Sequence, residues 1–236
     1  TNACPVEVSN EVEQGLTWRK AIYIPLPQAI PTRYLIDRKS CLGVEPNTCA
    51  RCKATCSLKA IDYNQKEQTI KLSVGSVILA VGAEAYDPSK ETSYNYRHKN
   101  VITSMEFERL MNASGPTGGE IVKPSDKTKP KKIAFIQCVG SRDASRFNEL
   151  CSAVCCMYAT KEGILAKEHD PELDVTIFFI DLRAHGKGFE EFTNRAKEMG
   201  INPLPEQMKL KSTDNQFVLL NSSLPNYTHS QFTYVY

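Results

Sequence analysis

Residues 132–143 have the sequence Lys-Ile-Ala-Phe-Ile-Gln-Cys-Val-Gly-Ser-Arg-Asp, an apolar run of strand length that ends at a cysteine and a glycine turn. The following segments predict a helix over Ser152–His169, a buried strand over Asp174–Asp181 and, after a second glycine turn, an amphipathic helix over Phe189–Met199. Strands that alternate with helices are typical of a parallel, doubly wound sheet. The sequence therefore predicts an α/β fold for this part of the chain.

Shorter signals precede this pattern. Residues 69–82, Thr-Ile-Lys-Leu-Ser-Val-Gly-Ser-Val-Ile-Leu-Ala-Val-Gly, predict two short strands divided at Gly75. Asn100–Ser104 predicts a further strand, and Met105–Met111 predicts a short helix. Residues 113–131 are rich in serine, glycine, proline and lysine, which favours a long loop or linker.

The bulk composition is that of an ordinary globular protein. The 236 residues are 41% hydrophobic and 24% charged, with a formal net charge of +2. Acidic and basic residues are interspersed, so no basic stripe indicates a nucleic acid partner, and no apolar run reaches the length of a bilayer span. The chain opens Thr-Asn-Ala-Cys-Pro, with neither Met nor a secretory leader, which we interpret as a cut inside a longer chain.

Nine cysteines are the most specific chemical feature. The first set is Cys4, Cys41, Cys49, Cys52 and Cys56, and the second set is Cys138, Cys151, Cys155 and Cys156. Cysteines in such number without a secretory leader favour a reducing compartment, and we expect a cytoplasmic protein. An odd count and an adjacent cysteine pair fit disulfides poorly, because neighbouring residues rarely bridge without strain. Thiolate clusters at these spacings instead indicate iron–sulfur ligation.

The first set lies in a loop-rich segment, residues 1–62, whose one extended stretch is Lys20–Leu26. Bacterial-type ferredoxin modules bind two 4Fe–4S clusters through paired cysteine runs, and the fourth cysteine of each run ligates the other cluster. Cys4-Pro5 resembles the end of one run, and the second run is Cys41-x7-Cys49-x2-Cys52-x3-Cys56. With crossed ligation, one complete cluster is bound by Cys4, Cys41, Cys49 and Cys52. Cys56 then binds a second cluster, whose other three cysteine ligands are absent from this sequence.

Two alternatives remain open for the first set. A local assignment leaves Cys4 unused and places one cluster on Cys41, Cys49, Cys52 and Cys56. A structural zinc site usually shows two separated cysteine pairs with short spacers, which this spacing resembles poorly.

The second set has the spacing Cys138-x12-Cys151-x3-Cys155-Cys156, so that Cys138 closes a strand and the other three open the predicted helix. Cys151 and Cys155, four residues apart, share a helix face. The intervening loop can return Cys138 to the helix start, where the positive end of the helix dipole favours an anionic cluster. Burial in an apolar core would explain one or two such cysteines far better than four.

The sequence contains no G-x-G-x-x-G, so it lacks the fingerprint that identifies a dinucleotide site on its own. A buried strand that ends in Ala-x-Gly is nevertheless typical of a second FAD contact, because only a small residue lets the backbone approach the cofactor. Ala80 and Gly82 are therefore candidate FAD-binding residues. An ordinary strand that ends in a glycine turn is the alternative.

Longer stretches carry a resemblance to the A-type subunits of heterodisulfide reductase, which are iron–sulfur flavoproteins of methanogens and related anaerobes. The resemblance covers about residues 1–201. Its stretches are Cys4-Pro-Val-Glu-Val8, Arg19–Pro31, Ile78-Leu-Ala-Val-Gly82, Glu106–Gly119, Ile133–Asp143 and Gly186–Phe192, with Tyr158 after the cysteine pair.

The resemblance implies a thioredoxin-reductase-like, Rossmann-like FAD domain with an inserted ferredoxin module of α+β fold. It assigns 1–66 to the C-terminal part of the inserted two-cluster module and 67–130 to the returning part of the FAD domain with its linker. Residues 131–202 would be the βαβ part of a second dinucleotide-type domain. Residues 203–236 do not resemble the family, and we expect a divergent or disordered tail.

The resemblance also implies that Cys138, Cys151, Cys155 and Cys156 ligate a further 4Fe–4S cluster. It places Lys161 near the flavin as a candidate catalytic residue, since a cation there would stabilise reduced, anionic flavin. Arg142 is a further candidate for cofactor binding. A solvated lysine and an ordinary surface turn are the alternatives for these two residues.

The family passes electrons through clusters and FAD toward the CoM–CoB heterodisulfide and ferredoxin. The implied partners are other heterodisulfide reductase subunits, an electron donor of the hydrogenase or formate dehydrogenase type, and ferredoxin. The N-terminal domain, the glycine-rich FAD loop and three ferredoxin cysteines are missing, so we expect the chain alone to be inactive. The alternatives are the flavoprotein subunit of a quinone-interacting oxidoreductase of sulfate reducers, and a non-redox structural module that binds a cluster or zinc.

Overall fold

The computed structural model describes residues 2–44, 46, 48–90, 94–144, 148–205, 209–213, 216–220 and 232–235. The chain divides into two compact units, Thr1–Glu84 and Ala85–Tyr236. Within the described ranges, no helix combines the length and the apolar character that crossing a membrane requires.

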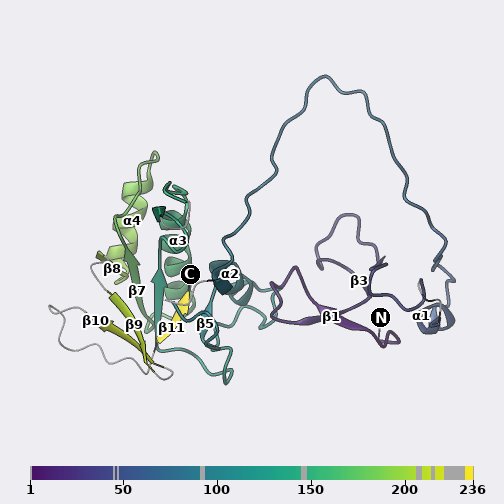
Figure 1. Cartoon of the computed structure of the whole chain (residues 1–236), viewed down its shortest axis with the longest axis horizontal. Helices are drawn as coiled ribbons and strands as arrows, with labels where there is room; N and C mark the ends of the chain where they lie inside the picture. Colours follow the sequence, from purple (N-terminus) through teal and green to yellow (C-terminus); the bar gives the residue numbers. More distant parts are fainter. Residues whose placement is uncertain are drawn as a thin grey trace. The chain divides into compact units, whose positions relative to one another are not determined.

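In its described residues, the N-terminal unit (Thr1–Glu84) has two small antiparallel strand pairs and one short helix. The elements are β1 (Glu7–Ser9) paired with β2 (Trp18–Lys20), β3 (Ile22–Tyr23) paired with β4 (Leu35–Ile36), and α1 (Arg51–Thr55) (Figure 1). The turn between β1 and β2 closes where Asn10 N donates to Thr17 O at 2.9 Å, with Gly15 in the left-handed region at φ +80°. The strands are too short to enclose a large core of their own, so the loops between them complete the unit.

The two strands predicted within residues 69–82 do not form, and this segment has no regular secondary structure (Figure 1). Its apolar side chains lie in solvent: Ile78 is 90% exposed and Val81 is 92% exposed. A strand needs the backbone hydrogen bonds of a neighbouring strand, and no strand of the described residues pairs with this segment. The composition favours a strand, but the pairing partner decides whether one forms, and the prediction of strands here is wrong.

The C-terminal unit (Ala85–Tyr236) contains a five-stranded sheet of order β5-β11-β6-β7-β8 in which every neighbouring pair is parallel. Its strands are β5 (Val101–Ile102), β6 (Lys132–Ile136), β7 (Asp174–Phe179), β8 (Asn202–Pro205) and β11 (Phe232–Val235). The unit also contains the 3-10 turn η1 (Pro88–Lys90) and a separate antiparallel pair, β9 (Lys209–Thr213) with β10 (Gln216–Leu220).

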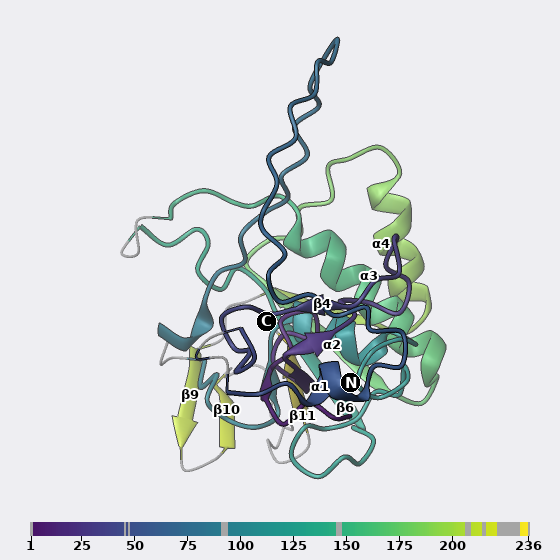
Figure 2. The same ribbon diagram turned by 90° about the vertical axis from the view of Figure 1, so that its right-hand side faces the viewer.

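Three helices of the described residues accompany the parallel sheet: α2 (Ser104–Met111), α3 (Cys155–His169) and α4 (Phe189–Glu198). Helix α3 contacts both α2 and α4, and it lies beside α4 in both views (Figure 1 and Figure 2). Phe107 of α2 packs edge-on against Phe135 of β6, with 5.5 Å between ring centroids. Gly163 of α3 faces Val175 and Ile177 of β7. Phe135 and Ile177 are paired in neighbouring strands, so their side chains point to the same face of the sheet. Helix α2 contacts Phe135 and α3 contacts Ile177, so both helices cover this face.

Helix α4 covers that face as well. Its residues Thr193 and Ala196 line a small cavity together with Ile177 and Phe179 of β7. A doubly wound sheet has helices on both faces, whereas in the described part of this unit α2, α3 and α4 all lie on one face. The predicted α/β class is confirmed, and the doubly wound arrangement is not seen among the described residues.

The last stretch of the chain is more regular, where it is described, than the sequence predicts. In place of an irregular tail, β8 extends one edge of the sheet and β11 inserts between β5 and β6. In β11, Tyr234 lies opposite Val101 on one side and Ala134 on the other. Its residues, Phe-Thr-Tyr-Val, are aromatic or β-branched and fit a pleated sheet. Scattered apolar residues upstream conceal this signal in the sequence.

Candidate functional site

Three thiols of the first cysteine set meet in the core of the N-terminal unit. Cys4 is buried with Ala21 and Ile22, and Cys41 and Cys52 pack against this small core. Cys4 precedes β1, Cys41 follows β4 and Cys52 lies in α1, so the fold brings together positions far apart in the sequence. In this unit the sulfur-bearing side chains replace the larger apolar core that a domain of this size would otherwise need.

Tyr63 places Cys49 in the same group. The Tyr63 hydroxyl oxygen lies 3.0 Å from Cys52 Sγ. Burial raises the pKa of Tyr63, and the hydrogen bond to Cys52 and the negative charges of the Cys52, Cys41 and Cys49 thiolates raise it further. All three thiols therefore lie near one hydroxyl. Sequence reasoning missed Tyr63, because a lone tyrosine eleven residues after Cys52 has no motif to mark it.

Cys56 is the C-cap residue of α1. Its amide donates to Lys53 O at 3.4 Å, and its carbonyl accepts from Lys59 N at 3.1 Å. Among the contacts of the described residues, none joins Cys56 Sγ to another thiol of the first set. The burial of Cys4 beside Cys41 and Cys52 is compatible with crossed ligation, and the choice between crossed and local ligation stays a prediction.

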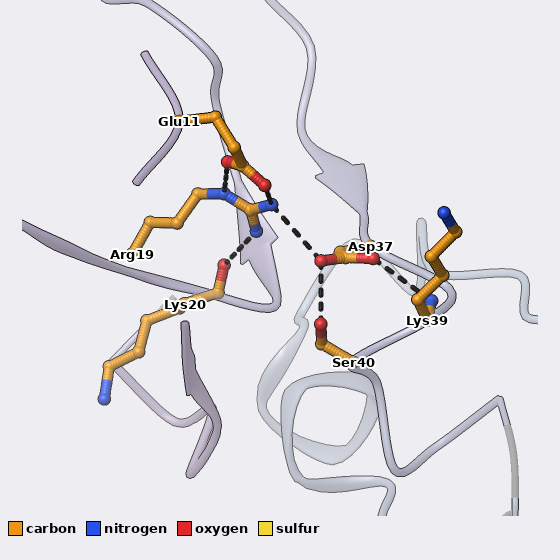
Figure 3. Close-up of polar contacts among 6 residues, drawn as sticks. All are labelled: Glu11, Arg19, Lys20, Asp37, Lys39 and Ser40. Atoms are coloured by element: carbon orange, nitrogen blue, oxygen red, sulfur yellow. Dashed lines mark hydrogen bonds and ion pairs between the residues drawn. The ribbon is translucent and has the colours of Figure 1, made fainter. Parts of the chain in front are cut away.

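A polar network fixes the loop that carries Cys41 to the strands (Figure 3). Arg19 of β2 binds Glu11 through two hydrogen bonds of 2.7 Å and reaches Asp37 at 3.2 Å. Asp37 accepts from Ser40 Oγ at 2.9 Å, and its carbonyl accepts from Cys41 N at 2.9 Å. Burial opposes the ionised form of Asp37, but hydrogen bonds from Ser40 and Arg19 outweigh it and lower the pKa of that carboxyl. A charged network thus stabilises a loop that has little apolar packing.

The second cysteine set lies where β6 ends and α3 begins. Cys138 follows β6 with a left-handed backbone, φ +64°, and Cys155 and Cys156 are the first residues of α3. Hydrogen bonds from Cys138 and then Cys156 hold the pKa of Cys155 far below its ordinary value, in spite of burial. The Cys156 sulfur accepts from Arg183 N at 3.5 Å. Three thiols therefore meet at a helix N-terminus, whose free amides favour negative charge.

Cys151 is half-buried in the loop before α3. Its sulfur accepts from Ala153 N at 3.3 Å. The hydrogen bond with Asp181 raises the pKa of Arg183, and the thiolates of Cys151 and Cys138 raise it further, so these two sulfurs lie within range of the guanidinium. Because α3 begins only at Cys155, the predicted helix face shared by Cys151 and Cys155 is wrong, and Cys151 lies in the loop before the helix. That all four cysteines of the second set ligate one cluster stays a prediction.

Arg142, a candidate cofactor ligand, lies beside the second set. Its guanidinium pairs with Asp181 at 2.5 Å, and Asp181 also binds Arg183 at 3.1 Å. The pKa of Asp181 is lowered, first by the hydrogen bond from Arg183 and then by the charges of Arg142 and Arg183. The two arginines and one aspartate leave a net positive charge next to the thiols.

Glu162 of α3 is a buried acid that sequence reasoning missed. It is 6% exposed, Ser104 Oγ donates to its Oε1 at 2.5 Å, and its Oε2 has no hydrogen-bond partner. Burial raises the pKa of Glu162 to about 8, with the hydrogen bond from Ser104 and the charge of Lys161 acting in the opposite direction. A signal was present, since Glu162 continues the buried row that contains Cys155, Ala159 and Ala166.

The remaining predicted cofactor residues are Ala80 and Gly82 in the N-terminal unit and Lys161 in the C-terminal unit. Lys161 is an exposed residue of α3, and Ala80 is exposed in the segment that lacks regular structure. Gly82 has a left-handed backbone, φ +76°, and an added Cβ would meet no atom within 4 Å. Within the described residues of the N-terminal unit, Ala80 and Gly82 therefore lie in an exposed, irregular segment.

The two thiol groups offer the ligand type of iron–sulfur clusters. In the described part of the chain, no three histidine, cysteine or acidic side chains are close enough to hold one metal ion. A 4Fe–4S cluster is larger than one ion, so its cysteine ligands stand farther apart around it. Each group offers four thiols, which is the ligand type that iron–sulfur clusters take.

Known proteins resemble the chain over most of its length. No protein-family model matches. The chain is 46% identical over 196 residues to the A-type subunit of the H(2):CoB-CoM heterodisulfide,ferredoxin reductase of Methanothermobacter thermautotrophicus, a match that covers 83% of this chain and 29% of that protein. It is 47% identical over 196 residues to the A-type iron-sulfur subunit of the CoB--CoM heterodisulfide reductase of Methanocaldococcus jannaschii, with the same shares. It is 50% identical over 200 residues to the second A-type iron-sulfur subunit of the same kind of reductase in Methanopyrus kandleri, covering 84% and 30%.

The chain spans less than a third of the length of these curated relatives. The matched part is nevertheless most of the chain, and the relatives share one subunit name across several methanogens. The chain therefore belongs to the family of A-type subunits of heterodisulfide reductase, and it corresponds to a segment of them.

Proposed function

We propose that this chain is an electron-transfer segment of an oxidoreductase of the heterodisulfide reductase type. The observation that carries the proposal is the meeting of Cys138, Cys155 and Cys156 at the N-terminus of α3, with Cys151 in the loop before it. Apolar residues could fill the space at this helix start as well as four thiols do, so packing alone does not explain the cysteines. When bound there, a 4Fe–4S cluster would accept and release single electrons.

The residues around the second set suit an anionic cluster. Cys155 and Cys156 are the first residues of α3, where a helix has free amides, and the Arg183 backbone N–H donates to Cys156 Sγ. The guanidinium of Arg183 lies within electrostatic range of Cys151 and Cys138. Together these groups would stabilise thiolates in a site that is partly removed from water.

The first set would hold one complete 4Fe–4S cluster through Cys4, Cys41, Cys49 and Cys52. The packing of Cys4 with Cys41 and Cys52, and the shared neighbour Tyr63, support this set. Cys56 would then ligate a second cluster together with cysteines outside this sequence. The N-terminal unit would be the C-terminal part of a two-cluster ferredoxin module, and its clusters would pass electrons between partners and the flavin.

FAD would bind to a Rossmann-like domain of the whole protein, with Ala80 and Gly82 as backbone contacts. The open space around Gly82 leaves room for another group to approach its backbone. Lys161, exposed on α3, would lie near the flavin and stabilise its reduced form, and Arg142 would contribute positive charge to the same region.

The names of the relatives indicate the reaction and the partners of the whole protein. They include H(2), formate, ferredoxin and the CoB-CoM heterodisulfide. By this likeness, electrons from a hydrogenase or formate dehydrogenase would pass through FAD and the clusters toward ferredoxin and the CoM–CoB heterodisulfide on partner subunits. The reducing cytoplasm would suit nine cysteines that form no disulfide among the described residues.

Metal and flavin analysis of the full-length parent protein, purified without oxygen, tests the proposal. We expect iron, sulfide and flavin in the wild type, and we expect Cys151→Ala to lose about four irons while the ferredoxin-type clusters persist. A colourless protein that contains zinc would contradict the proposal. Unchanged iron in Cys151→Ala would contradict the assignment of the second set.

A further inference from the structure

We propose that Tyr63 tunes the reduction potential of the cluster held by the first cysteine set, through a hydrogen bond from its phenol to the Cys52 sulfur. The inference rests on the proposed function, because it needs a cluster at Cys4, Cys41, Cys49 and Cys52. It adds a residue that is not a ligand and that no cysteine spacing marks.

The geometry fixes the direction of this hydrogen bond. The Tyr63 hydroxyl oxygen and Cys52 Sγ are 3.0 Å apart, and either atom could donate in the free thiol. A cysteine that ligates a cluster is a thiolate and has no proton to give. The phenol is protonated at neutral pH, so Tyr63 must donate and Cys52 must accept.

The surrounding chain holds the phenol in place. A Cβ added at Gly43 would lie 3.1 Å from both Cζ and the hydroxyl oxygen of Tyr63, so the ring fits against a position that has no side chain. Arg38 donates to the carbonyls of Tyr63 at 3.4 Å and Gln65 at 3.2 Å, which ties down the backbone that carries the ring. Lys53 of α1 lies 5.7 Å from the ring centroid. The hydroxyl is thus aimed at Cys52 by contacts on several sides.

A donor held at a ligand sulfur favours the reduced cluster. Reduction adds one negative charge, part of which resides on the cysteine sulfurs, and hydrogen bonds to charged acceptors are stronger than those to less charged ones. Hydrogen bonds to the sulfurs are among the factors that set the potentials of iron–sulfur clusters. The bond from Tyr63 should therefore make the potential of this cluster more positive than that of the same cluster without it.

The test is Tyr63→Phe, which removes the hydroxyl and keeps the ring. In the chain purified without oxygen and loaded with iron and sulfide, we expect unchanged iron content and a more negative midpoint potential in a redox titration followed by electron paramagnetic resonance. The ratio of reduced to oxidised cluster at a fixed potential should fall roughly threefold or more, which is about 30 mV for a one-electron couple.

Tyr34→Phe is the matched control, because Tyr34 lies in the same unit and is 61% exposed. It should leave the potential unchanged. An unchanged potential in Tyr63→Phe, with the cluster present, would overturn the inference. If Cys52→Ala kept the full iron content, the proposed cluster site itself would be overturned, so the two failures are distinguishable.

A second substitution covers the case in which Tyr63→Phe does not retain its cluster. Incorporating 3-fluorotyrosine at position 63 keeps the ring and the hydroxyl but makes the O–H a stronger donor. The potential should then shift to more positive values, opposite to the change expected from Tyr63→Phe. A potential equal to that of the unmodified chain would contradict the role of Tyr63.

Discussion

The buried acid of α3 makes the stability of the C-terminal unit depend on pH, and Glu162→Gln should remove that dependence. Glu162 is 6% exposed, and only one of its two oxygens has a hydrogen-bond partner, Ser104. Glutamine has nearly the same shape, keeps an acceptor for Ser104 and cannot ionise. The substitution therefore isolates the effect of the charge from the effect of packing.

The size of the effect follows from the pKa of Glu162. Burial raises this pKa from 4.5 to about 8, so the folded unit keeps a proton that the unfolded chain releases in that interval. The unit consequently loses stability as pH rises from about 4.5 through about 8. With about 1.36 kcal/mol for each pKa unit, the penalty reaches on the order of 5 kcal/mol at high pH. About 2 kcal/mol of it develops between roughly pH 6 and pH 8.

Urea unfolding followed by far-ultraviolet circular dichroism measures this effect. The signal reports mainly the C-terminal unit, because α2, α3 and α4 lie there while the other unit has the five-residue α1 among its described residues. The urea concentration at the unfolding midpoint should decrease for the wild type as the pH is raised from 6 to 8. For Glu162→Gln it should stay the same. Glu172→Gln, at an exposed position, should behave as the wild type. Parallel pH profiles for the wild type and Glu162→Gln would refute the reasoning.

Two further substitutions test local structure in the same unit by the same unfolding assay. Thr103→Ala removes half of the capping box of α2, in which Thr103 Oγ1 accepts from Glu106 N at 3.2 Å, and should cost about 1 kcal/mol. Thr103→Ser should retain most of that stability, and equal losses in both variants would argue against the cap. Gly140→Ala places a side chain at φ +68° against the ring of Tyr86 and should cost about 1–2 kcal/mol. No loss there would show that the loop after Cys138 relaxes freely.

The sequence predicted the βαβ part of the fold well, because its signals are local. The apolar run of strand length before Cys138 is β6 (Lys132–Ile136), and the predicted helix at Ser152–His169 is α3 (Cys155–His169). Periodicity fixes which residues are buried in such elements without reference to distant parts of the chain. The later start of α3 leaves Cys151 outside the helix, so it reaches the thiol group from a loop.

The failures all depend on distant partners. Residues 69–82 have strand composition, but a strand exists only where another backbone pairs with it. The strand β11 shows the converse, since its place between β5 and β6 depends on a register that no local pattern specifies. Tyr63 was missed because only its contact with Cys52 makes it unusual, whereas the helical spacing of Glu162 with buried residues of α3 could have marked it.

Iron content per chain in two matched cysteine variants tests whether the first set holds a cluster by crossed ligation. The chain, Cys4→Ala and Cys56→Ala would each be purified without oxygen, loaded with iron and sulfide, and analysed for iron. We predict that Cys4→Ala loses about four irons while Cys56→Ala keeps the wild-type content. The opposite pattern, loss in Cys56→Ala with full retention in Cys4→Ala, would contradict crossed ligation, and equal iron in all three would contradict a cluster at the first set.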